Sequence, residues 1–127
     1  MKIDASIGEV VDKLTILSIK IDKFKSPDKL ANVKKEYKKL STEMEKAGIA
    51  LDSSEFLALK EVNQKLWNIE DAIRIKESKK EFDEEFIELA RSVYFFNDER
   101  SVIKKQINRK FNSELIEEKE YVEYKNT

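Results

Sequence analysis

One line of polar side chains brings together groups that could bind a ligand. Asn63, Trp67, Glu70 and Arg74 follow one another at intervals of four, three and four residues, with Asp71 beside them. At this spacing they project from one face of a helix. An indole, two carboxylates and a guanidinium on one face could form a polar pocket in which an anionic ligand binds and Trp67 stacks on it.

A second polar line lies further along the chain, where an apolar helical stripe changes its character. Its members are Asn97, Arg100, Lys104 and Asn108, and Arg91, Tyr94 and Asp98 lie alongside. Arg100 shares its heptad position with Phe86 and Val93, so its Cα should face the interior of the protein or a cleft. A buried charge is costly unless it is paired. We therefore expect Arg100 and Lys104 to meet Glu70, Asp71 or a carboxylate of the first helix.

These two lines admit two interpretations. They can be structural ion pairs that fix the register of neighbouring helices, or they can line a pocket in which Trp67 or Tyr94 stacks on a ligand. Arginine usage favours the pocket, because all four arginines fall in this half of the chain, at positions 74, 91, 100 and 109, and lysine serves elsewhere. The planar guanidinium binds carboxylate or phosphate through two hydrogen bonds, which an ammonium cannot do.

The first helix contributes Glu9, Asp12 and Lys13. Glu9 and Asp12 are three residues apart and could present two carboxylates to Mg²⁺ or Mn²⁺. The same spacing is common on charged helices, and Glu9 is expected to complete a capping box with Ser6. We therefore predict no metal and no cofactor, with a divalent cation at Glu9 and Asp12 as the weaker alternative.

Composition narrows the possible chemistry and location. The chain contains no Cys and no His, so an enzyme would have to use carboxylates, Lys, Arg, Tyr, Ser or Thr. A net charge of −1, with glutamates interleaved among the lysines, argues against a nucleic-acid binder. No apolar run approaches the ~20 residues that a membrane span needs. The first residues do not resemble a secretion signal, so we expect a cytoplasmic protein.

The apolar periodicity predicts a single all-α domain over residues 1–127. Helices are expected at about 6–24, 27–47, 53–77 and 83–110, packed as an antiparallel bundle, with a short helix or arm at 113–127. The first helix is apolar around much of its circumference, which is typical of a central or oligomeric helix. We therefore predict a homodimer with Ile16 and Ile19 at its interface.

Several stretches resemble a family that has been defined without a known function. They are "SIGEVVDKLTILSIK" (6–20), "KLANVKKE" (29–36), "LWNIEDAIR" (66–74), "FIELARSVYFFNDERSVIKKQIN" (86–108) and "LIEEKEY" (115–121). The family consists of short bacterial and phage proteins that are often encoded near surface-polysaccharide or glycosyltransferase genes. The resemblance implies a cytoplasmic helical protein connected to glycan assembly. It also places the family's polar motifs on both polar lines and on Ser6, Gly8, Glu9, Asp12 and Lys13.

Two functions follow as hypotheses. The first is a non-enzymatic binding or assembly module with a protein partner in polysaccharide biosynthesis. The alternative is a small enzyme with a carboxylate–Arg pocket. Such an enzyme would act with a metal on a phosphorylated or nucleotide-sugar substrate, or without a metal as a mutase of dicarboxylates.

Overall fold

Side-chain caps determine where each helix begins. The computed structural model describes residues 1–124, which contain α1 (Ile7–Lys23), α2 (Pro27–Lys46), α3 (Ser54–Ser78) and α4 (Glu84–Lys110) and no strand. The caps are Ser6, Ser26, Ser53 and Asp83, and each accepts a hydrogen bond from the backbone N–H three residues ahead. Each cap satisfies one of the N–H groups that have no partner inside the helix. The all-α prediction with four helices is thus confirmed.

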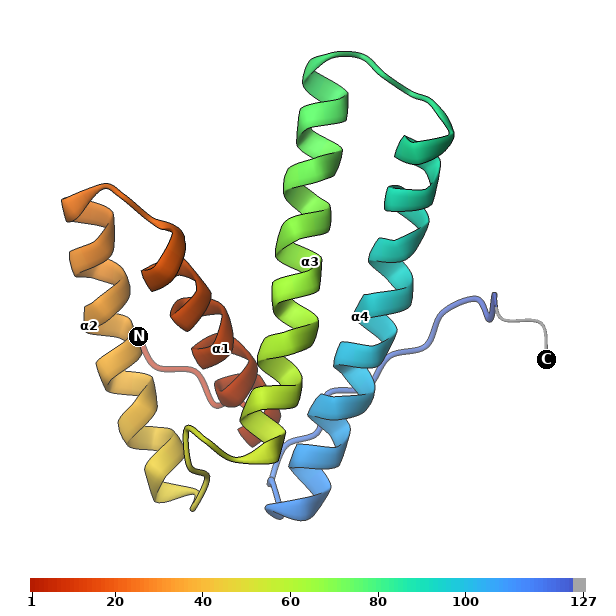
Figure 1. Cartoon of the computed structure of the whole chain (residues 1–127). Coiled ribbons are helices and arrows are strands. Elements are labelled where there is room, and N and C mark those ends of the chain that lie inside the picture. The colour runs from red at the N-terminus through yellow and green to blue at the C-terminus, as the bar shows by residue number, and fades with distance from the viewer. Residues whose placement is uncertain (125–127) are drawn as a thin grey trace.

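The α1 helix occupies the centre of the arrangement. It packs against α2, α3 and α4, whereas α2 packs against α1 alone among the helices. α3 and α4 lie side by side and extend well beyond the ends of α1 and α2 (Figure 1). No helix among the described residues is long and apolar enough to cross a membrane.

The main hydrophobic core lies at the end of the molecule opposite the projecting tip of α3 and α4. Its buried members are Val11, Leu14, Met44, Ile49, Phe56, Leu59 and Ile107. They come from the first half of α1, the end of α2 and the loop after it, the start of α3 and the end of α4. Burial of one such side chain contributes roughly 1.5–3 kcal/mol to stability.

The second apolar side of α1 is covered by the chain itself. Ile19 is completely buried and Ile16 is half-buried, although both were expected at a dimer interface. The expectation for Ile19 is wrong, because the helix packs against three neighbours and leaves this side chain no exposed surface. The homodimer itself remains a prediction.

Lys76 forms ion pairs across the loop that connects α3 to α4. The Nζ of Lys76 lies 2.8 Å from Asp83, 3.3 Å from Glu81 and 3.1 Å from Glu85. The hydrogen bonds that Lys76 donates to Asp83 and Glu85 raise the pKa of Lys76, and Lys76 in turn lowers the pKa of Asp83. These ion pairs thus join the last turn of α3 to the capped start of α4.

The first backbone N–H groups of α1 donate hydrogen bonds to side chains at the end of α4 and just after it. The N–H of Gly8 donates to Oδ1 of Asn108 at 2.6 Å, and the N–H of Ile7 donates to Oγ of Ser113 at 3.0 Å. A Cβ on Gly8 would lie 2.7 Å from the carbonyl oxygen of Lys104. The absence of a side chain at Gly8 therefore permits the closest approach of the two helices.

Beyond Ser113 the chain forms an arm, residues 114–124, that contains no helix and turns back alongside α4 (Figure 1). Glu118 lies 3.1 Å from Lys105, and the hydroxyl of Tyr121 donates to Asp98 at 3.3 Å. A short helix or an arm was expected for this segment, and the described part of it forms an arm. Residues 125–127 of the predicted segment lie outside the described residues.

We predict that Gly8→Ala destabilises the protein by about 1–3 kcal/mol, because the new methyl group overlaps backbone that cannot move aside easily. Helix propensity alone predicts the opposite sign, since alanine is favoured over glycine by up to ~1 kcal/mol. Urea denaturation measures the difference. A variant more stable than the wild type would show that α1 and α4 do not approach closely.

Candidate functional site

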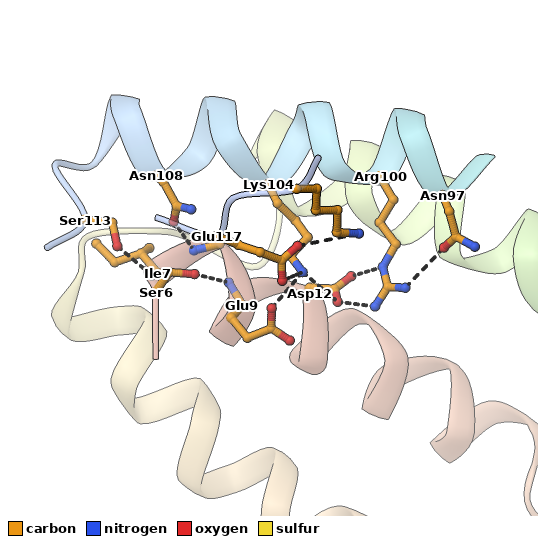
Figure 2. A network of polar contacts seen from close by, with 12 residues as sticks. Ser6, Ile7, Glu9, Asp12, Asn97, Arg100, Lys104, Asn108, Ser113 and Glu117 are labelled. Carbon is orange, nitrogen blue, oxygen red and sulfur yellow. Dashed lines mark hydrogen bonds and ion pairs between the residues drawn. The ribbon is translucent and has the colours of Figure 1, made fainter. Parts of the chain in front are cut away.

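The polar line of α4 faces α1 along its whole length. Asn97, Arg100, Lys104 and Asn108 project from α4 toward α1 (Figure 2), and each takes part in a hydrogen bond. The four residues therefore lie on one face of α4, as their helical spacing predicted. This face joins α4 to the central helix.

At the centre of this face Arg100 forms a two-pronged ion pair with Asp12. Its Nε donates to Oδ1 at 2.9 Å and its Nη2 donates to Oδ2. Asp12 is only 1% exposed, so a guanidinium fixed by two hydrogen bonds is the partner that its buried charge requires. Arg100 therefore pairs with a carboxylate of the first helix, one of the partners expected, and not with Glu70 or Asp71.

Asn63 ties α3 to the same carboxylate. Its Nδ2 donates to Oδ1 of Asp12 at 2.8 Å and lies 2.7 Å from Oγ1 of Thr15, which itself donates to the carbonyl oxygen of Asp12. The sequence indicated Asn63 only as a member of the first polar line, which it begins, and it did not indicate Thr15 at all.

Lys104 forms the second cationic position. Its side chain is 7% exposed, and its Nζ lies 2.6 Å from Glu9, 3.4 Å from Glu117 and 3.9 Å from Asp12. The capping box expected at Glu9 is therefore incomplete: Ser6 accepts the N–H of Glu9, but the Glu9 carboxylate binds Lys104. The network thus contains two cations and three carboxylates, of which Lys104 and Asp12 are buried.

These ion pairs affect the proton affinities of their members. The hydrogen bonds to Asp12 raise the pKa of Arg100, against the effect of burial. Burial raises the pKa of Glu117, but Lys104 and Lys119 outweigh it and lower the pKa below 4.5. Both shifts favour the charged forms of Arg100 and Glu117.

A hollow of about 610 Å³ lies between α1, α3 and α4, beside the Arg100–Asp12 pair. Six predicted site residues line it: Trp67, Glu70, Asp71, Arg74, Asn97 and Arg100. Ile16, Ile19, Asn63 and Leu66 complete the lining. The structure therefore brings the first polar line together with part of the second.

The charges of the hollow do not favour an anion. Arg100 is neutralised by Asp12, and Arg74 is 79% exposed and lies 3.8 Å from Glu70. Asp71 adds a further negative charge. The lining therefore offers carboxylate acceptors, amide and guanidinium donors and an indole, without an excess of positive charge. Such a set suits a polar ligand that carries no net negative charge.

The remaining predicted residues lie elsewhere. Arg91 is exposed and lies 3.6 Å from Glu88. Asp98 accepts a hydrogen bond from Tyr121 of the arm. Tyr94 packs against Phe95 with ring centroids 5.1 Å apart. Lys13 is 3.6 Å from Glu36. Glu9, Asp12 and Lys13 line a separate hollow of about 240 Å³ that also touches Arg100.

The carboxylates considered for a metal are engaged with basic side chains. Glu9 binds Lys104 and Asp12 binds Arg100. Within residues 1–124, no three acidic side chains converge in a way that could hold a metal ion.

Comparison with known proteins identifies a family. The model of DUF6165, a family of unknown function, matches residues 1–127, and this confirms the family resemblance seen in the sequence. Neither the curated proteins nor the solved structures contain a significant match.

We predict that Arg100→Ala lowers the free energy of unfolding by about 3–5 kcal/mol, because it leaves the buried Asp12 carboxylate without its cation. Arg74→Ala removes an equally large but exposed side chain, and its effect should stay within about 0.5 kcal/mol. Denaturant melts of both variants measure these values. Equal effects would contradict a buried pair at Arg100.

Acidification should release the arm. Because the folded pKa of Glu117 is lowered, its ion pairs stabilise the arm above pH 4.5 and are lost as the pH falls through the folded pKa. Amide hydrogen exchange in residues 114–124 should accelerate in this range before the helices unfold. In the Glu117→Gln variant the amides of the arm should exchange faster already at neutral pH, and acidification should increase their exchange rate less than in the wild type. If acidification accelerated the exchange equally in the variant and in the wild type, Glu117 would not hold the arm.

Proposed function

We propose the following function for this chain, which belongs to the family of unknown function DUF6165. It is a non-enzymatic binding module, and its ligand site is the hollow between α1, α3 and α4. The placement of Trp67, from one helix, beside polar groups from two helices carries this proposal. Trp67 is half-buried, so its ring can lose further surface to a ligand without leaving its position against Phe24.

The proposed ligand is an uncharged ring that carries several hydroxyl groups, as in a sugar residue. Glu70 and Asp71 can accept hydrogen bonds from hydroxyls, and Asn97 can donate through its amide. Arg100 is held in place by Asp12 and keeps N–H groups beyond those that its three protein hydrogen bonds use. A donor fixed in advance loses little entropy on binding.

A role in cytoplasmic polysaccharide biosynthesis, with a protein partner in glycan assembly, is the wider part of the proposal. The resemblance found in the sequence supports it, and a sugar-sized polar site is consistent with it. In this role the module presents or retains a glycan intermediate and does not convert it.

The alternative function is a small enzyme that uses the same hollow. The arrangement favouring it is the meeting of Glu70 and Asp71 with Arg74 and Arg100, a carboxylate–arginine set that could transfer protons. A phosphorylated, nucleotide-sugar or dicarboxylate substrate would have to draw the exposed Arg74 away from Glu70. The two functions differ in whether a bound compound is altered.

Trp67 allows a direct test, because it is the only tryptophan of the chain. We expect a set of neutral monosaccharides and oligosaccharides to contain a compound that changes Trp67 fluorescence saturably. The same compound at 100 times its Kd should stabilise the fold by ~2.7 kcal/mol. Nucleotide sugars, dicarboxylates, Mg²⁺ and Mn²⁺ are titrated in parallel.

Matched variants locate the binding. Asp71→Asn and Asn97→Ala should weaken the fluorescence response, whereas Asp28→Asn on the exposed start of α2 should not. If the bound compound is converted, as seen by mass spectrometry of the mixture, the enzyme alternative replaces the binding module. If no class of compound changes the fluorescence or the stability, the proposed ligand site is wrong.

A further inference from the structure

The arm and the end of α4 have opposite charges. Residues 114–124 contain five glutamates and one lysine, whereas residues 97–110 of α4 contain five basic and two acidic residues. Glu117 lies 3.4 Å from Lys104, and Glu118 lies 3.1 Å from Lys105. The end of α4 is thus a surface that recognises an acidic extended segment.

Aromatic contacts fix the far end of the arm. The ring of Tyr124 lies 4.7 Å from that of Tyr94 and 5.3 Å from that of Phe95, between centroids. The hydroxyls of Tyr124 and Tyr121 both donate to Asp98. Together with the ion pairs, these contacts define one register for the arm on α4.

Contacts with its own chain leave much of the arm uncovered. Leu115, Ile116 and Val122 are exposed, Val122 to 87%, and Val102 of α4 is exposed beside the arm. Exposed ion pairs such as Lys105–Glu118 contribute little to stability, whereas ordering each residue of an extended segment has a larger entropic cost. Additional apolar burial would therefore stabilise the ordered arm.

The groove between arm and α4, of about 310 Å³, also contains an unsatisfied donor. Asn108 lines this groove and is 1% exposed, and its Nδ2 has no hydrogen-bond partner among the described residues. In Figure 2 this amide nitrogen points to the side of α4 on which Glu117 lies. An identical arm from a second copy would leave this donor as it is, so only the exposed apolar side chains of the arm point to a second chain.

We propose that two copies of the chain exchange their arms, so that residues 114–124 of each lie on α4 of the other. Every copy carries both the acidic segment and the basic groove, and the exchange repeats all the contacts described here across a two-fold axis. It begins after Ser113, whose backbone N–H donates to the carbonyl oxygen of Asn108 at 2.7 Å. The arms then cover Leu115, Ile116 and Val122 between the two copies.

The arrangement also makes the buried network depend on the dimer. Glu117 of the partner subunit would supply the carboxylate that Lys104 binds beside Glu9 and Asp12. The homodimer predicted from the sequence would therefore form through α4 and the arm and not through Ile16 and Ile19.

A charge-reversal pair tests the exchange. Lys105→Glu and Glu118→Lys each place like charges at the contact between arm and α4, whether the arm lies on its own chain or on that of an identical copy. In an equimolar mixture, sedimentation velocity should show a heterodimer that is about tenfold or more tighter than the dimer of either variant alone. In this mixture each mutated arm meets the mutated groove of the other variant, and each normal arm meets a normal groove.

The rescue occurs only if arms cross between copies. An arm that stays on its own chain would keep the like-charge contact in both variants, and mixing would change nothing. A monomeric wild type, or a dimer whose constant is unaffected by mixing, would overturn the proposal. Both positions are on the surface, and circular dichroism melts verify that the variants fold as the wild type does.

Discussion

The position of α1 depends on one buried ion pair. Asp12 lies in the middle of the central helix with almost no exposed surface, and it is satisfied by Arg100 from α4 and Asn63 from α3. Separating α1 from either helix would leave a charge or an amide without its partner in a dry environment, which costs several kcal/mol. The apolar core holds the helices together, whereas this pair specifies which residues of α1, α3 and α4 lie opposite one another.

The same pair and the unequal helix lengths create the hollow. α1 has 17 residues, whereas α3 has 25 and α4 has 27. The central helix therefore ends partway along its two neighbours (Figure 1), and the hollow beside its Ile16 and Ile19 is lined by the polar line of α3. Because Arg100 belongs to this lining, Asp12 orients a guanidinium beside the hollow. A structural ion pair and a ligand site, which the sequence presented as alternatives, can thus share one arginine.

Local signals predicted the helices, and periodicity predicted which face of α4 is polar and turned inward. Four capping side chains mark the four starts, and the spacing of Arg100 and Lys104 correctly placed them against another helix. Periodicity does not identify the neighbour, and for that reason Asp12 was only one of several possible partners of Arg100. The capping role of Glu9 and the interface role of Ile19 were wrong for a related reason: the helices packed on α1 give Glu9 a lysine and bury Ile19. The arm has no periodic pattern, so its path along α4 could not be predicted.

The most direct measurement of the central claim is the NMR signal of the Arg100 side chain. If Arg100 is fixed by Asp12 in a buried pair, its Hε should exchange slowly with water and show a through-hydrogen-bond coupling to the Asp12 carboxylate carbon. The exposed Arg74 and Arg91 serve as internal references with rapid exchange. An Arg100 signal that exchanges as fast as these two, with no coupling, would contradict the account.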